Sequence, residues 1–257
     1  MFKQVLYEIF AGHQVTDVML AEAVRLFSEH YGIWGEHSHN PGAFPVSFSL
    51  LSPLKLSIGK HVNFSTCRLR QQILPDPSTT YYVKVTVDGK FAGNVFACRW
   101  GYANKTIWWV TQLVVHRCYR QRGLATGLLA CLKSNVTSDI YGIMSSHPAS
   151  IMATASTFGF TVGGIDIDFI RVNAEGIIQA SPIPYVRDAK LRGLLFEGFD
   201  ASTELVCEAD TNFFVDHKEP EEILNAISGA KKWSLGKLPE GHEYLLILKG
   251  RPVISSF

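Results

Sequence analysis

The chain has 257 residues, of which 47% are hydrophobic, and a formal net charge of +1 at pH 7. A chain of this length folds as one large domain or as one domain with a substantial extension, and it has enough apolar residues for a full core. The near-neutral charge and the absence of a basic run in the sequence exclude the usual signature of a nucleic-acid-binding protein.

The cysteines and residues 1–15 indicate in which cellular compartment the protein is expected. The five cysteines are odd in number and form no C-x-x-C pair, which favours free thiols in a reducing compartment over disulfides or a zinc site. Residues 1–15 contain only short apolar runs, broken by Glu8 and Gly12, and no stretch of the sequence is long enough to span a bilayer. We therefore expect a soluble, cytoplasmic protein that binds no metal and no membrane.

The first third of the chain predicts one strand and two helices. A short apolar run at residues 2–10 predicts the strand. Thr16 and Asp17 can cap a helix that continues to about His30, because apolar residues follow at nearly helical spacing. A second helix is expected around residues 64–73, ending before a Pro-Asp-Pro sequence.

The middle of the chain predicts three consecutive antiparallel strands. Residues 81–87 and 91–100 have the apolar pattern of strands, and the intervening Asp88 and Gly89 form a favoured two-residue hairpin turn. A third strand is expected at residues 106–115, which are bulky and β-branched, as in the centre of a sheet.

The most informative segment is residues 113–129, which combine a buried strand, a basic turn with one glycine and the start of a helix. A helix N-terminus presents unpaired backbone N–H groups and a partial positive charge, so it attracts anions. Gly123 has no Cβ, which allows the backbone to approach a phosphate closely. Arg117, Arg120 and Arg122 add positive charge beside the turn, which therefore predicts a diphosphate-binding site. A nucleic-acid patch is the alternative, but neither further lysines nor interleaved aromatic residues accompany these arginines.

This segment resembles the acetyl-CoA-binding motif of the GNAT superfamily of N-acyltransferases. The family pattern, Gln/Arg-x-x-Gly-x-Gly/Ala, is matched here by Arg120, Gly123 and Ala125. The resemblance covers roughly residues 81–160, under a third of the chain. It implies acetyl-CoA as the cosubstrate. The residues that it assigns to the diphosphate are Arg120, Gln121, Arg122, Gly123, Leu124, Ala125 and Thr126.

The same resemblance places the pantetheine arm of acetyl-CoA in a wedge between two parallel strands. The second of these strands is expected at residues 140–145, and a helix is expected from Pro148 to Phe158. The family's oxyanion donor, a backbone N–H of the first strand, falls at Val114 or Val115. The residues assigned to the arm are Leu113, Val114 and Val115 on one side and Ser145, Ser146 and His147 on the other.

The family's acid and base do not carry over to this sequence. The tyrosine that protonates the leaving thiolate in many members falls at or near Ala155. His147 is the first candidate for an acid or base, because imidazole titrates near neutrality, and helix capping is its alternative role. Ser146 is a candidate donor to the thiolate or, equally, a cap. The predicted catalytic set is therefore His147, Ser146 and the backbone of Val115.

A loop after the first helix predicts the acceptor site. Tyr31, Trp34 and Glu36 suit a cationic guest, because aromatic faces and a carboxylate attract an ammonium group. The alternative is that the two aromatic residues belong to the core and that Glu36 is solvated.

The resemblance fades after residue 160. We expect an acetyltransferase domain at residues 1–180 and a C-terminal α/β extension at residues 181–257 that packs on or completes the same domain. The elements expected after residue 160 are helices at 173–181 and 219–227 and strands at 203–207, 212–215 and 244–249.

The sequence thus predicts an α/β (α+β) fold with a mixed, largely antiparallel central sheet, flanked by helices and splayed at two parallel strands. The predicted function is acetyl transfer from acetyl-CoA to a primary amine, with a small molecule favoured, by direct attack in a ternary complex. The alternatives are a CoA-binding sensor or interaction protein with reduced catalysis, and an acetyltransferase for protein lysines or N-termini. A monomer or homodimer is expected.

Overall fold

The computed structural model of the protein describes residues 4–38, 59–135, 137–196, 207–228 and 233–250. The strands are β1 Val5–Ala11, β2 Thr80–Val87, β3 Lys90–Tyr102, β4 Lys105–Val115, β5 Ile140–Ser145, β6 Lys190–Arg192, β7 Glu208–Asp210 and β8 His242–Lys249. The α-helices are α1 Asp17–His30, α2 Thr66–Ile73, α3 Leu124–Asn135, α4 Pro148–Thr157, α5 Ile167–Gln179, α6 Pro184–Arg187 and α7 Lys218–Ser228.

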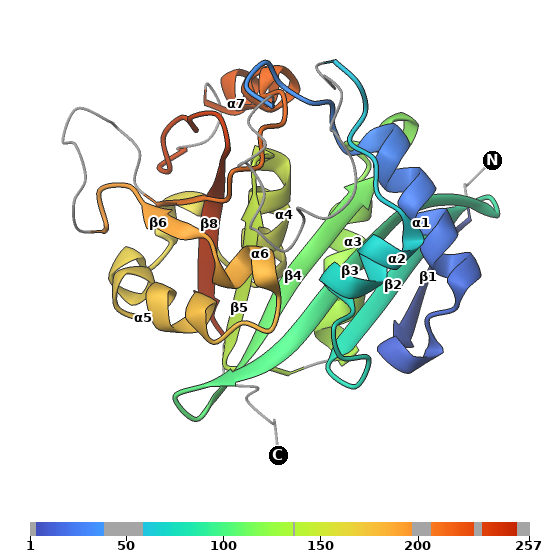
Figure 1. Ribbon diagram of the computed structural model, residues 1–257, viewed down its shortest axis with the longest axis horizontal. Coiled ribbons are helices and arrows are strands. Elements are labelled where there is room, and N and C mark those ends of the chain that lie inside the picture. Colours follow the sequence, from blue (N-terminus) through green and yellow to red (C-terminus); the bar gives the residue numbers. More distant parts are fainter. Residues whose placement is uncertain (1–3, 39–58, 136, 197–206, 229–232, 251–257) are drawn as a thin grey trace.

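The strands form one twisted sheet in the order β1-β2-β3-β4-β5-β8-β7-β6 (Figure 1). Neighbouring strands are antiparallel except for β4 and β5, which are parallel. The prediction of a mixed, largely antiparallel sheet with one parallel pair is therefore confirmed. Because β8, β7 and β6 continue the sheet beyond β5, the last part of the chain extends the same sheet. The division at residue 180 stays a prediction.

Helices lie on both faces of this sheet. Figure 1 shows α1, α2 and α6 on the near face and α3 and α4 behind it. Helix α3 contacts β1 to β4, while α4 contacts β5 and β8. The apolar side chains of both sheet faces are therefore covered, as a sheet with buried central strands requires.

The hairpin between β2 and β3 follows from local turn chemistry. Asp88 and Gly89 both have positive φ, 49° and 75°, and Val87 pairs with Lys90 across the turn. A two-residue turn with positive φ at both positions matches the twist of the flanking strands, and Asp-Gly adopts it readily. The predicted hairpin thus has the expected turn and register.

The two parallel strands separate after a short paired stretch. They pair only from Ile107 with Ile140 to Val110 with Ile143, although β4 continues for five more residues. The β3–β4 register also shifts between Phe96 and Ala97, so that a bulge falls at Thr111. The splay expected between these strands therefore begins at the bulge.

The C-terminal elements differ from the prediction in two places, and one predicted strand lies largely outside the described residues. Helix α5 begins at Ile167 instead of residue 173, because the carboxylate of Asp166 accepts a hydrogen bond from the Phe169 backbone N–H and caps the first turn. The strand expected at 212–215 is wrong, since Val215 makes only an isolated bridge with Trp34. Residues 203–206 lie outside the described residues, and the nearest strand is β7. Helix α7 and strand β8 include the ranges predicted for them.

Candidate functional site

A cavity of about 700 Å³ lies where β4 and β5 have separated. Its walls come from the end of β4, the turn before α3, the start of α4 and the start of α7. The sequence-predicted residues that line it are Leu113, Val114, Val115, Arg120, Gln121, Gly123, Leu124, Ala125, Thr126, Ser145, Ser146 and His147. Arg122 does not line it, and its guanidinium lies over the ring of Tyr119, 5.6 Å from the centroid.

The turn before α3 presents backbone N–H groups to this cavity. Among the described residues, no protein acceptor is recorded for the N–H groups of residues 121–126. Gly123 has φ of +76°, and a Cβ built on it would meet no atom within 4 Å. The turn therefore combines unpaired donors at a helix N-terminus with open space above them, which is the chemistry that binds a phosphate group.

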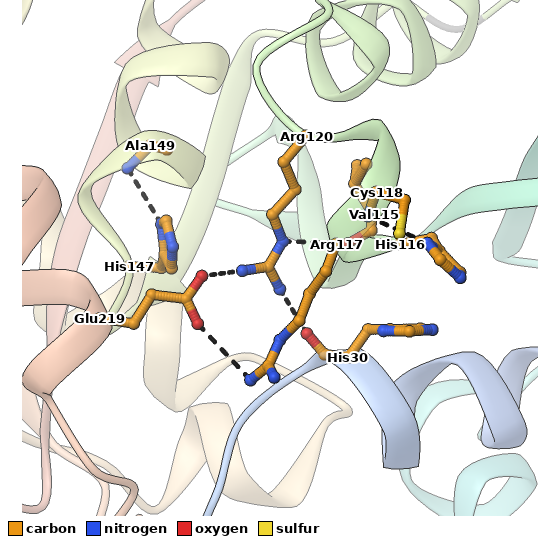
Figure 2. Close-up of polar contacts among 9 residues, drawn as sticks. All are labelled: His30, Val115, His116, Arg117, Cys118, Arg120, His147, Ala149 and Glu219. Atoms are coloured by element: carbon orange, nitrogen blue, oxygen red, sulfur yellow. Dashed lines mark hydrogen bonds and ion pairs between the residues drawn. The ribbon is translucent and has the colours of Figure 1, made fainter.

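The arginines beside the turn are already partnered by protein atoms. The Arg120 guanidinium donates to the Val115 carbonyl at 3.2 Å, to the His30 carbonyl and to the Glu219 carboxylate, as Figure 2 shows. Arg117 also pairs with Glu219, at 3.7 Å. The Glu219 carboxylate therefore already pairs with Arg117 and Arg120, the two cations that the sequence analysis placed beside a diphosphate.

Strand β4 directs alternate backbone groups into the gap. The His116 N–H donates to the Ala92 carbonyl of β3. Because hydrogen-bonded and non-hydrogen-bonded pairs alternate in an antiparallel ladder, Val114 also faces β3, whereas Leu113 and Val115 face away from it. The Arg120 contact with the Val115 carbonyl agrees with this orientation. Of the two residues predicted as oxyanion donors, Val115 therefore has its N–H toward the gap.

His147 caps helix α4. Its Nδ1 accepts a hydrogen bond from the Ala149 N–H at 3.2 Å (Figure 2). Burial and the nearby Arg120 guanidinium lower the pKa of His147 to about 4. A neutral imidazole with one nitrogen engaged in capping is a poor proton acceptor near pH 7, so the geometry favours the alternative role that the sequence left open. Ser146 is buried beside it.

A second, smaller cavity of about 100 Å³ lies on the near face of the sheet, against α1, α2 and α6. It contains one buried carboxyl, that of Glu243 on β8. Burial raises the pKa of Glu243 to about 7, although a hydrogen bond with Thr211 acts in the opposite direction. The aromatic residues that line the cavity are Phe27, Tyr31, Phe64, Tyr185 and Phe213.

The two cavities meet at four shared residues. Tyr31, Leu113, Ser145 and Ser150 line both of them. These residues follow α1 or belong to β4, β5 and α4, so the two cavities adjoin at the gap between β4 and β5. A reacting group held at this junction would be reached from both cavities.

The structure brings only one of the three predicted acceptor residues to this place. Tyr31 lines both cavities, but Trp34 and Glu36 line neither. Trp34 packs edge-on against Phe213, and Glu36 is exposed. Trp34 and Glu36 therefore lie away from both cavities, and their role as acceptor residues stays a prediction.

The sequence reasoning missed Glu243 and the position of Glu219. Glu243 is a carboxylate next to an otherwise apolar strand, which is an available signal for a buried functional group. Glu219 was named only as the first residue of the helix expected at 219–227, because nothing local indicates that α7 lies beside the turn. Ala155, at the family's tyrosine position, is buried in the core.

The described residues contain no group of three or more His, Cys, Asp or Glu side chains that could hold a metal ion. Within the same residues no helix combines the length and the apolar character needed to cross a membrane.

Comparisons with known proteins give matches in structure only. No family model matches the sequence, and no curated protein matches it. Similar solved structures include a GNAT-family acetyltransferase from Streptococcus pneumoniae, with 14% identity over 62% of this chain and 85% of that chain and a TM-score of 0.38. They also include the ribosomal-protein-S18-alanine N-acetyltransferase from Escherichia coli, with 13% identity over 60% and 77% of the two chains and a TM-score of 0.37. An aminoglycoside acetyltransferase from an uncultured soil metagenomic sample has 13% identity over 51% and 68% and a TM-score of 0.33.

These matches include acetyltransferases of the GNAT family, the family that the turn before α3 resembles in sequence. The TM-scores of these superpositions are low, so the superpositions carry no argument about the fold. The description of the fold rests on the strand order and on the separation of β4 and β5.

Proposed function

We propose that the protein transfers an acetyl group from acetyl-CoA to a primary amine by direct attack in a ternary complex. The observation that carries this proposal is the cavity of about 700 Å³, which ends at the unpaired N–H groups of residues 121–126. A cavity of this size suits a cofactor-sized ligand. The donors at its end suit the diphosphate of a nucleotide.

The residues present fit acetyl-CoA in charge and in space. The N–H groups from Gln121 to Thr126 would hold the diphosphate, and Gly123 leaves room for it. Leu113 and Val115 would pair with the pantetheine arm through backbone groups that face the gap. When bound, acetyl-CoA supplies a thioester as the acetyl donor.

The chain's own backbone supplies the electrophilic assistance. An N–H of Leu113 or Val115 at the gap would donate to the thioester oxygen as negative charge develops on it. A covalent acyl-enzyme is disfavoured, because none of the five cysteines lines either cavity. Direct attack by the amine is the remaining route.

The test is calorimetric titration with acetyl-CoA, followed by a thiol-release assay with a panel of amines. We expect saturable binding and amine-dependent release of free CoA. Absence of binding would remove the assignment of the large cavity. Binding without release for any amine would instead favour the second candidate, a CoA-binding sensor or interaction protein. The burial of Ala155 at the family's tyrosine position is the observation that favours this second candidate.

The nature of the acceptor is a separate question. The names of the similar structures include both aminoglycoside and ribosomal-protein acetyltransferases, so they do not choose between a small molecule and a protein. A small pocket with aromatic walls supports a small amine more than a folded protein surface, because a pocket of this kind encloses most of its ligand.

A further inference from the structure

The smaller cavity has no role in holding acetyl-CoA, yet it opens onto the junction at which acetyl transfer would occur. We propose that it binds the acceptor, a small apolar primary amine, and that Glu243 accepts the proton that this amine must lose. The proposal rests on the function proposed above and names the acceptor class and the base for it.

The position of the cavity gives the first argument. It lies against α1, α2 and α6, whereas the large cavity extends from the residues after α1 to the starts of α3, α4 and α7. Figure 1 shows α1, α2 and α6 in front of the sheet and α3 and α4 behind it. Tyr31, Leu113, Ser145 and Ser150 line both cavities. An amine in the small cavity and a thioester in the large one would therefore meet at the gap between β4 and β5.

The chemistry of the walls gives the second argument. Aromatic faces attract an ammonium group, and a buried carboxylate gives it a counter-ion. Among the described residues, Glu243 has no ion-pair partner. The buried amide of Gln112 and the hydroxyl of Thr111 also have no recorded hydrogen-bond partner there, and both residues line the cavity. A polar ligand that binds between these groups would supply the hydrogen-bond partners that they lack.

The volume limits the size of the acceptor. A dry cavity of about 150 Å³ is known to hold a benzene molecule. The present cavity, at about 100 Å³ and open toward the junction, would take a short alkyl amine or the end of a one-ring arylalkylamine. A highly charged polyamine would have no partner for its further ammonium groups.

The proton balance can be written for each step. The ammonium form of the amine gives one proton to the Glu243 carboxylate and becomes a neutral nucleophile. Its lone pair forms the new N–C bond while the C–S bond of the thioester breaks and the thiolate takes the bonding electrons. The nitrogen loses its second proton to that thiolate through solvent, and Glu243 returns its proton to bulk water.

The titratable groups that face Glu243 do not themselves titrate in the neutral range. Tyr31 at the end of α1 and Tyr185 on α6 feel its charge, and Thr211 after β7 forms a hydrogen bond with it. Burial and that charge raise the pKa of both tyrosines well above the usual value, so both stay neutral. The pKa of about 7 for Glu243 is close to the value that suits a general base near neutral pH.

The experiment measures acetylation of butylamine, benzylamine and 2-phenylethylamine, with spermidine and a lysine-containing peptide as comparison acceptors. The variants are Glu243→Gln, which keeps the shape of the side chain without its charge, and Glu243→Asp, which withdraws the carboxylate by one methylene. Glu208→Gln is the matched control, because Glu208 is also buried in the same sheet but lines neither cavity. Acetyl-CoA affinity is measured by calorimetry for each protein.

We expect Glu243→Gln to lower kcat for the small amines by about 100-fold or more, the range that a general base contributes, with acetyl-CoA affinity unchanged. The wild-type kcat/KM should rise with pH through about 7, and this inflection should disappear in Glu243→Gln. Glu243→Asp should be intermediate and Glu208→Gln close to wild type.

If Glu243→Gln had the same kcat and the same pH profile as the wild-type protein, the assignment of Glu243 as the base would be overturned. Acetylation of spermidine or the peptide in preference to all three small amines would overturn the acceptor class. Failure of the wild-type protein to bind acetyl-CoA, or to release CoA with any amine, would overturn the proposed function itself and is recognised before any variant is made.

Discussion

The two cavities differ in how the chain builds them. The large cavity ends at a contiguous segment, residues 120–126, whose donors are created by the start of one helix. The small cavity takes its residues from several elements, among them α1, α2, β4, β5, α6 and β8. Its carboxyl, that of Glu243, and the bulge at Thr111 both line it, although more than 130 residues separate them in the sequence. A site made by local structure is visible in sequence, whereas a site made by topology is visible only once the sheet order is known.

The largest effect is expected for Gly123→Glu, which disrupts the local site in the turn before α3. The substitution places a carboxylate in the open space above the turn and puts a side chain on a backbone with φ of +76°. We expect acetyl-CoA affinity to fall by at least about 100-fold, because a like charge and a steric block meet the diphosphate. Calorimetric titration measures the loss.

Gly89→Glu is the matched control for this change. Gly89 also has positive φ, +75°, and open space around its Cβ position, but it lies in the β2–β3 turn. It should carry the same backbone strain and the same added charge without loss of acetyl-CoA binding. Equal affinities for wild type and Gly123→Glu would show that the large cavity has another ligand.

The non-local site can be tested through stability, independently of activity. Burial raises the pKa of Glu243 from 4.5 to about 7, so the folded state favours the neutral carboxyl. The stability that this gives is fully present below about pH 4.5 and is lost as the pH rises through about 7. The loss is on the order of 3 kcal/mol, since each pH unit between the two values corresponds to about 1.4 kcal/mol.

Glu243→Gln should remove this dependence. We expect the variant to be more stable than wild type at pH 8 and similar at pH 4.5 to 5, as measured by urea denaturation at each pH. A variant that is less stable than wild type at pH 8 would mean that the carboxylate has a cationic partner in the folded protein, which would contradict a free base in the pocket.

The fold was predictable to a large extent because its signals are local. The Asp88-Gly89 turn fixes one hairpin, and the strand–turn–helix order around Gly123 fixes the geometry of the turn before α3. The start of α5 was missed because the carboxylate of Asp166, seven residues before the expected start, caps the helix. The strand expected at 212–215 forms only an isolated bridge between Val215 and Trp34, and a short apolar run of this kind has the same pattern as an edge strand.

The candidate site was predictable only in its local half. His147 follows a strand and precedes a proline, so both a cap and a catalytic group fit that pattern, and only its burial and its contact with Ala149 favour the cap. Trp34 and Glu36 had the right chemistry for an ammonium site, but the chain direction after α1 turns them away from both cavities. Glu243 requires β8 to pair with β5, a contact between segments about 100 residues apart.

Glu219→Gln sharpens the comparison by removing a long-range ion pair from the local site. Arg120 and Arg117 both pair with the Glu219 carboxylate at the mouth of the large cavity (Figure 2), so an incoming diphosphate competes with it. A half-exposed charge pair contributes up to about 1 kcal/mol, so we expect acetyl-CoA affinity to rise by roughly fivefold at low salt, and by less at high salt.

Glu222→Gln is the control for the change in net charge. Glu222 lies on the same helix and lines the same cavity, but no ion pair is recorded for it among the described residues. A similar gain in acetyl-CoA affinity in both variants would mean that the effect comes from the negative charge of α7 in general and not from the ion pair between Glu219 and Arg120. A loss of affinity in Glu219→Gln would mean that Glu219 holds Arg120 in its binding orientation, in which case α7 would be part of the acetyl-CoA site and the turn before α3 would no longer be a purely local one.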